Sequence, residues 1–122
     1  MTGRVIVLAQ DLIWADRLAR AVEAAGAQPV RVGSLDRLMG ALPGADAAII
    51  DLTALAYDGV AAIEAARAGG CRVLAVGQHD DHELRKRASA AGAERVYAYR
   101  KMFDDGPATI ATWLGRTTPV GS

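Results

Sequence analysis

The sequence lacks several features that would define a function class. It contains a single cysteine, Cys71, so an intramolecular disulfide is impossible and a thiolate metal site has no basis. Its 14 basic residues balance 14 acidic ones, and this neutrality creates no overall field toward nucleic acid or an anionic membrane. The most basic cluster, residues 85–87, is typical of a solvated helix face. We therefore expect neither nucleic-acid binding nor membrane binding.

Targeting segments and enzyme motifs are also missing from the sequence. The first residues lead directly into a short strand-like run, and no apolar run reaches the roughly 20 residues of a membrane span. We expect a cytoplasmic protein. Gly69-Gly70 is not followed by the Lys-Ser/Thr of a phosphate loop, Ser89 has no base at nucleophile spacing, and no dinucleotide fingerprint is present. An enzyme is therefore not predicted.

Apolar runs alternate with helical patterns five times along the 122 residues, which suffice for one domain. The expected strands are residues 4–9, 29–32, 45–51, 72–76 and 95–99, and the expected helices are about 14–25, 35–42, 59–68, 81–91 and a short one opening at 105–107. Right-handed crossovers then predict an α/β fold, a single doubly wound flavodoxin-like domain with a parallel five-stranded sheet in the order 2-1-3-4-5. We assign residues 1–116 to this domain and 117–122 to a frayed tail.

The most informative segment is the apolar run 45–51, which ends in Asp51 and is followed seven residues later by Asp58-Gly59. Ligands and reacting groups collect at the carboxyl ends of parallel strands, so Asp51 lies where chemistry is expected. Taken alone, Asp51 would be interpreted as a strand-end carboxylate that caps a loop or helix. The Asp-Gly pair favours a more specific interpretation.

Asp51 with Asp58-Gly59 resembles the phosphoacceptor segment of response-regulator receiver domains, and Ala-Ala-Gly-Ala at 90–93 resembles the segment before their fifth strand. The resemblance spans Arg4 to about Leu114. It implies the fold described above and a phosphoacceptor role for Asp51. It also implies an acidic pair after the first strand that holds Mg²⁺, a Thr or Ser after the fourth strand, and a Lys after the fifth.

The chain departs from this pattern at the metal and switch positions. The acidic pair is matched by Ala9 and Gln10, or by Gln10 and Asp11 if the alignment shifts by one residue. Asp11 and Asp51 together would hold Mg²⁺ weakly. Gly77 stands at the hydroxyl position, so no side chain is present there to capture a phosphate oxygen.

The lysine position also differs. Counting from Gly92, it is occupied by Tyr99, and Lys101 comes two residues late. Because strand side chains alternate, Lys101 in an extended strand would face the same side as Tyr99 and would act as a phosphate partner, whereas a strand ending near Tyr99 leaves it solvated. Leu55 stands where the family has a proline after the acceptor.

A second polar segment, His79-Asp80-Asp81-His82, contains residue types that bind metals. Asp80 with Glu83 three residues later fits a helix cap. We interpret the segment as a polar loop.

Two hypotheses follow from the resemblance. The first is an atypical receiver, or pseudo-receiver, that acts through protein–protein interaction independently of phosphorylation and needs no cofactor. Its partner is another protein or a second copy, bound on the surface of the fourth helix, fifth strand and fifth helix, where we expect Arg85, Arg87, Tyr97, Ile110 and Trp113.

The alternative is a working two-component receiver, phosphorylated on Asp51 by a histidine kinase, with Mg²⁺ held by Asp11 and Asp51. At most it would catalyse its own phosphorylation from a phosphodonor. A third possibility, a flavodoxin-like domain for a small ligand, has no positive motif in the sequence.

Overall fold

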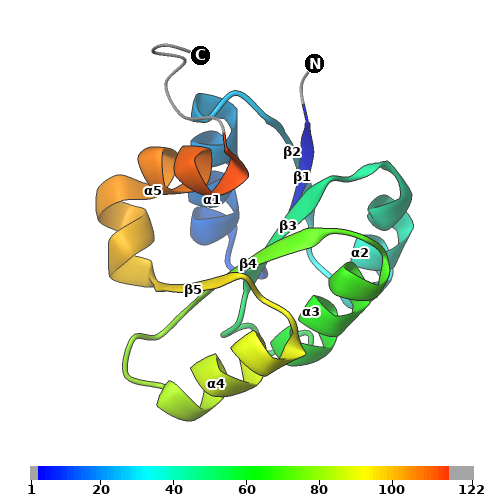
Figure 1. Ribbon diagram of the computed structural model, residues 1–122, viewed down its shortest axis with the longest axis vertical. Coiled ribbons are helices and arrows are strands. Elements are labelled where there is room, and N and C mark those ends of the chain that lie inside the picture. Colours follow the sequence, from blue (N-terminus) through cyan, green and yellow to red (C-terminus); the bar gives the residue numbers. More distant parts are fainter. Residues whose placement is uncertain (1–2, 116–122) are drawn as a thin grey trace.

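The computed structural model describes residues 3–115, in which five parallel strands form one sheet in the order β2-β1-β3-β4-β5 (Figure 1). The strands are β1 (Arg4–Leu8), β2 (Gln28–Val32), β3 (Ala47–Asp51), β4 (Arg72–Gly77) and β5 (Arg95–Ala98). The predicted fold class and strand order are confirmed. The predicted tail, 117–122, and the domain end at 116 lie outside the described residues.

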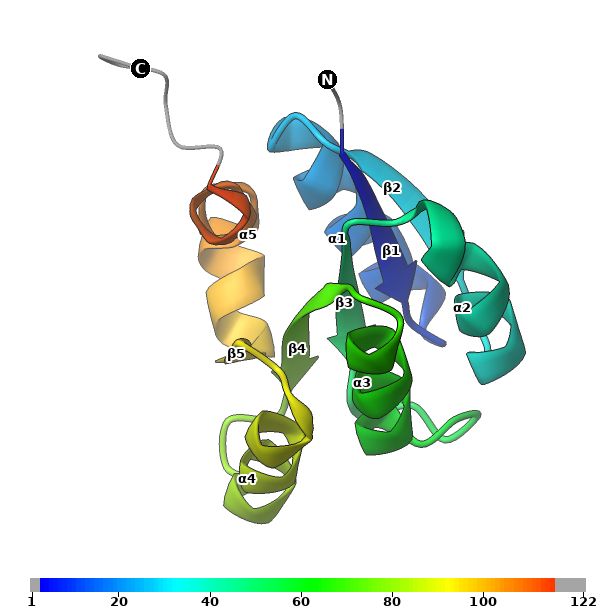
Figure 2. The same cartoon turned by 45° about the vertical axis from the view of Figure 1, so that its right-hand side comes forward.

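Helices cover both faces of the sheet. They are α1 (Leu12–Ala24), α2 (Leu35–Ala41), α3 (Gly59–Ala68), α4 (His82–Ala91) and α5 (Tyr99–Leu114), with a short 3-10 turn, η1 (Leu42–Gly44), after α2. α1 and α5 lie side by side on one face, and α2, α3 and α4 cover the other (Figures 1 and 2). Within residues 3–115, none of the helices has the length and apolarity needed to cross a membrane.

The core lies in two layers, one on each side of β3, which is buried at every position. One layer joins the sheet to α2, α3 and α4, and the other joins it to α1 and α5. The continuous apolar character of β3 is what a central parallel strand requires, because both of its faces are covered. Asp51, its last residue, is thereby placed at the middle of the sheet's carboxyl edge.

Side-chain caps fix where the helices begin. Ser34 Oγ accepts from the Arg37 N–H at 3.2 Å, and Asp58 Oδ1 accepts from the Val60 N–H at 3.0 Å, so α2 and α3 start as predicted. The cap predicted for α4 is wrong by one residue. Asp81, not Asp80, accepts from the Leu84 N–H at 3.1 Å, because α4 begins at His82 and the cap is the residue directly before the first helical one.

The last helix begins earlier than predicted. β5 ends at Ala98, α5 starts at Tyr99, and a non-helical Asp105 (φ −147°, ψ 33°) divides α5 where the sequence indicated its start. Pro107 follows this break and has no N–H to contribute, so the second part of α5 tolerates it in its first turn. Consequently Lys101 lies in a helix, and the strand alternation that would have turned it toward Asp51 does not apply.

Candidate functional site

The site is built around Asp51, whose side chain is only 2% exposed. Its Oδ1 accepts from the Thr53 N–H at 3.1 Å, contacts Thr53 Oγ1 at 3.0 Å and accepts from the Tyr99 hydroxyl. The hydroxyls of Thr53 and Tyr99 also contact each other. Every donor to this carboxylate oxygen is therefore neutral, and none of the three comes from a lysine or arginine.

Tyr99 is the residue that the resemblance to receiver domains puts in the place of a lysine. It is the first residue of α5, and its ring lies on Trp14 of α1, with centroids 4.8 Å apart. Burial, followed by the hydrogen bond to Asp51, raises the pKa of the Tyr99 hydroxyl well above its usual value. Tyr99 is thus a neutral donor to Asp51 at physiological pH, and the structure places it beside Asp51.

Lys101 lies on the outer part of α5. Its ammonium pairs with Asp105 at 3.7 Å, and its side chain is 48% exposed. Within residues 3–115, no hydrogen bond or ion pair joins Lys101 to Asp51. The solvated Lys101 is the outcome expected if the strand ended near Tyr99.

The residues at the position of the acidic pair, after β1, make hydrogen bonds that hold the local structure. Gln10 Oε1 accepts from the N–H groups of Leu55 and Ala56, at 2.8 and 3.2 Å, and so holds the loop after β3. Asp11 Oδ1 accepts from the N–H of Ile13 at 2.8 Å and caps α1. Ala9, the other residue of the alternative alignment, is buried.

These residues do not fit a magnesium centre. Asp11 and Asp51 line one cavity of about 340 Å³, but one oxygen of each carboxylate already accepts backbone N–H groups, as does the amide oxygen of Gln10. Mg²⁺ prefers near-octahedral oxygen coordination. Among residues 3–115, no cluster of three or more His, Cys, Asp or Glu side chains is placed to hold a metal ion.

Gly77 ends β4 beside the site, and the space next to it is filled. A Cβ at this position would lie 3.3 Å from Leu52 Cδ1 and 3.5 Å from Leu52 Cβ. The buried side chain of Leu52 therefore occupies the region into which a threonine or serine would project. Leu52 would therefore have to shift to admit a side chain at Gly77.

Sequence reasoning missed Thr53 and Tyr57. The buried Tyr57 hydroxyl lies 2.7 Å from the backbone oxygen of Asp51 and 3.1 Å from that of Leu8, joining the ends of β3 and β1. Burial, then the charge of Asp51, raises its pKa far above the usual value, so it stays a neutral donor. The only signals were positional, since Tyr57 directly precedes Asp58-Gly59 and Thr53 lies two residues after Asp51.

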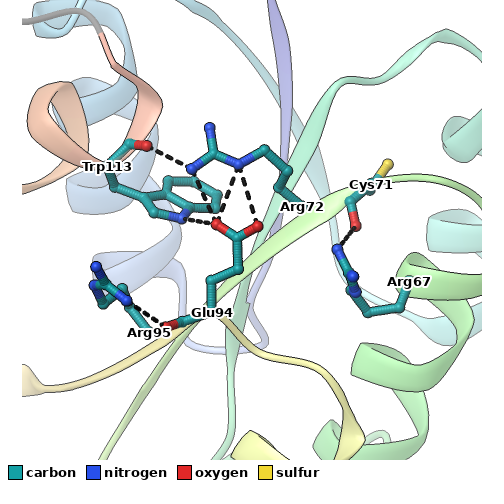
Figure 3. A network of polar contacts seen from close by, with 6 residues as sticks. All are labelled: Arg67, Cys71, Arg72, Glu94, Arg95 and Trp113. Carbon is teal, nitrogen blue, oxygen red and sulfur yellow. Dashed lines mark hydrogen bonds and ion pairs between the residues drawn. The ribbon is translucent and has the colours of Figure 1, made fainter.

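The predicted docking surface is partly wrong. Ile110 is fully buried and Trp113 is 7% exposed, because the apolar stripe of α5 faces the sheet and α1. The Trp113 indole N–H donates to Glu94 at 3.0 Å, and the Arg72 guanidinium lies 5.0 Å from the ring centroid (Figure 3). Neither Ile110 nor Trp113 is available as an anchor for a partner.

The other predicted surface residues lie outside or at the margin of the core. Arg87 is exposed, and Arg85 donates to the Val96 backbone oxygen at 3.0 Å. Tyr97 is partly buried against the core layer of α1 and α5. On the predicted docking surface the basic residues are therefore accessible, whereas the large apolar residues are buried.

Comparison with known proteins adds structural matches only, since no family model and no curated protein matches the sequence. A CheY-like receiver domain protein from Methanospirillum hungatei matches with a TM-score of 0.73 and 14% identity, over 92% of this chain and 96% of that one. A response regulator from Burkholderia pseudomallei, with a phosphorylated aspartic acid, calcium and citrate, matches with a TM-score of 0.71 and 18% identity. The match covers 80% of this chain and 59% of that one. A protein from the same organism, described as pilus assembly-related, matches with a TM-score of 0.73 and 25% identity. The match covers 94% of this chain and 88% of that one.

These matches agree with the strand order and with the helices on both faces of the sheet. The chain has the fold of response-regulator receiver domains.

Proposed function

We propose that this chain is a cytoplasmic signalling domain of the receiver type that acts by binding another protein, without phosphorylation of Asp51 and without enzymatic activity. The observation that carries the proposal is the contact between the Tyr99 hydroxyl and Asp51. It fills the place where a receiver has the ammonium that pairs with the phosphoryl group.

Charge at the site supports this proposal. A phosphoryl group adds up to about two negative charges, and a cation or a metal ion must offset them. Lys101 pairs with Asp105 on its own helix, and the donors at Asp51 are neutral. The hydroxyls of Thr53 and Tyr99 both contact Asp51 Oδ1, so a phosphodonor approaching that oxygen would have to displace both.

One observation favours the alternative, a working receiver. Asp11 and Asp51 line the same cavity, and each has a second carboxylate oxygen beyond the one used in the bonds described above. If Thr53 and Tyr99 move aside, these two oxygens would face the incoming group. The two hypotheses therefore differ in whether the Thr53 and Tyr99 hydroxyls can move away from Asp51.

A titration with Mg²⁺ and beryllofluoride, followed by amide NMR, tests the proposal on the intact chain. We expect no saturable shifts at residues 51–53 or 77, because one carboxylate of the acidic pair and the ammonium are missing. Asp51→Asn is the matched control, since it removes the acceptor charge with little change in volume. Saturable, Mg²⁺-dependent shifts that Asp51→Asn abolishes would reject the proposal and establish the working receiver.

A further inference from the structure

Helix α5 is divided into two parts at Asp105, whose dihedral angles (φ −147°, ψ 33°) are not helical. The first segment, residues 99–104, starts beside Asp51, and the second segment, residues 106–114, packs against the sheet and α1. Pro107 follows the break and has no N–H, so it cannot donate a helical hydrogen bond back across it. Asp105 is therefore the residue at which the two segments can change their relative direction.

A buried hydroxyl lies one turn after the break. Thr109 is 6% exposed, and within residues 3–115 its Oγ1 is the one buried side-chain nitrogen or oxygen without a hydrogen-bond partner. In an uninterrupted helix a threonine hydroxyl can donate to the backbone oxygen four residues earlier, which for Thr109 belongs to Asp105. Leaving a buried hydroxyl unpaired disfavours a state by about five- to 150-fold. A helical Asp105 would remove this unfavourable feature.

The second segment is fixed at its far end. Ile110 is fully buried, and the Trp113 indole donates to Glu94 at 3.0 Å. The Arg72 guanidinium donates to the Trp113 backbone oxygen at 2.7 Å (Figure 3). Because these contacts hold the second segment against the sheet, a change in the dihedral angles of Asp105 moves the first segment instead.

The first segment is held by fewer contacts, and Tyr99 connects it to the site. Its buried side chain is Met102, 2% exposed, whereas Phe103 is 59% exposed. The Tyr99 hydroxyl donates to Asp51, and the Tyr99 ring lies on Trp14. The direction of the first segment therefore determines whether the Tyr99 hydroxyl reaches Asp51.

We propose that α5 switches between two states that cover and uncover Asp51. In the bent state, which the structure shows, Asp105 is non-helical and Tyr99 contacts Asp51. In the straightened state Asp105 is helical, its backbone oxygen accepts from the Thr109 hydroxyl, and the first segment carries Tyr99 away from Asp51. Pro107 favours the bent state, because a proline inside a helix is disfavoured about 100-fold or more relative to alanine. The buried Thr109 hydroxyl favours the straightened state, so the two preferences oppose each other.

The inference goes beyond the proposed function by adding a means of regulation. A partner protein that binds one state of α5 more tightly than the other shifts the equilibrium toward that state. Because the switch involves the backbone of α5 and needs no phosphodonor, its failure and the failure of the proposed function are separate results.

The test combines amide relaxation dispersion with backbone carbon chemical shifts of the intact chain, without Mg²⁺ or phosphodonor. In wild type we expect microsecond-to-millisecond exchange at residues 99–109 and at the Thr53 amide, which donates to Asp51. Pro107→Ala should raise the equilibrium constant for straightening about 100-fold, because alanine is compatible with a helix interior. We expect helical carbon shifts at Asp105 in this variant and a changed Thr53 amide shift.

Further variants isolate the two hydroxyls. Thr109→Val, combined with Pro107→Ala, should lower the equilibrium constant for straightening by about fivefold or more, because valine needs no hydrogen-bond partner. Thr112→Val is the matched control, since Thr112 is an exposed threonine on the same helix, and it should leave the constant unchanged. Tyr99→Phe in the wild-type background should raise the constant by about fivefold or more, because only the bent state uses the Tyr99 hydroxyl. This variant keeps the test decisive if Pro107→Ala does not fold.

Three results would overturn the inference. The first is an Asp105 that keeps non-helical carbon shifts in Pro107→Ala, and the second is an absence of exchange at residues 99–109 in both wild type and Tyr99→Phe. The third is exchange that Thr109→Val and Thr112→Val change equally. The outcome is independent of the beryllofluoride titration. A chain that shows the switch and also accepts beryllofluoride would retain this inference and reject phosphorylation independence, and the reverse pair of results would do the opposite.

Discussion

Two polar clusters hold the two ends of α5, and they handle charge differently. At the carboxyl edge of the sheet, Asp51 is met by the hydroxyls of Thr53 and Tyr99. At the amino edge, Glu94 is met by the Arg72 guanidinium, at 2.9 Å, and by the Trp113 indole (Figure 3). The carboxylate of Glu94 is neutralised, whereas that of Asp51 is only solvated by dipoles.

Both carboxylates, Glu94 and Asp51, hold α5 in place, but only Glu94 does so through a charged partner. A paired Glu94 fixes the end of α5 through Arg72, which also donates to the Trp113 backbone oxygen at 2.7 Å. Asp51 holds the start of α5 through Tyr99, and within residues 3–115 no lysine or arginine side chain pairs with it. The edge of the sheet that carries Asp51 is thus a second anchoring point for α5.

The largest effect is expected at the amino edge. Trp113→Ala should lower the free energy of unfolding by about 3–5 kcal/mol, because it empties a buried volume between α5 and the sheet. Chemical denaturation measures this change. Phe103→Ala, on the exposed side of the same helix, is the control and should cost less than about 1 kcal/mol. Similar losses for both would break the assignment of Trp113 to the core.

A smaller effect is expected at the carboxyl edge. Tyr99→Phe removes the hydroxyl that donates to Asp51 and should lower the free energy of unfolding by about 1–3 kcal/mol, as for other hydrogen bonds to charged groups. Tyr97→Phe is the matched control, because Tyr97 packs partly buried against the same core layer. An unchanged stability in Tyr99→Phe would mean that the Asp51 contact does not anchor α5.

The pH dependence of stability sharpens the comparison at the amino edge. Hydrogen bonding to Arg72, and then to Trp113, lowers the pKa of Glu94 from its ordinary 4.5. Its contribution to stability is therefore complete above about pH 4.5 and is lost as the pH falls through the lower pKa of the folded state. Denaturation curves of wild type and Glu94→Gln should differ at pH 7 and approach each other as the pH is lowered below about 4.5. Curves that stay parallel would show that Glu94 is not selectively stabilised as a carboxylate.

The smallest effect is expected at Lys101. Lys101→Met should change the free energy of unfolding by no more than about 0.5 kcal/mol, since an exposed i,i+4 ion pair contributes little. Thermal denaturation at low and moderate salt measures this. A loss of more than about 1 kcal/mol would place Lys101 in the network of Asp51 and remove the distinction between the two clusters.

Local sequence signals were sufficient for the sheet and for part of the site. Alternating apolar runs with right-handed crossovers predicted the strand order, and Asp58 before Gly59 marked the start of α3, whereas Tyr99 was singled out through the resemblance to receiver domains, by counting from Gly92. These features depend on spacing along one or two neighbouring elements, which periodicity and capping rules describe well.

Features that depend on packing between distant segments could not be predicted in the same way. The stripe of Ile110 and Trp113 was visible in the sequence, but its direction is set by the docking of α5 against α1 and the sheet. Gln10 binds the loop at Leu55, 45 residues away, and Tyr57 reaches Leu8 across 49 residues. Such contacts follow from the assembled sheet, so an amide or hydroxyl in a loop gives no local sign of them.

The most direct test of the account is intact-mass analysis of the full chain after incubation with acetyl phosphate and Mg²⁺. Because neutral hydroxyls cover Asp51 and no cation faces it within residues 3–115, the account predicts an unmodified mass in wild type and in Asp51→Asn alike. A stoichiometric phosphoryl adduct in wild type, dependent on Mg²⁺ and absent from Asp51→Asn, would contradict it.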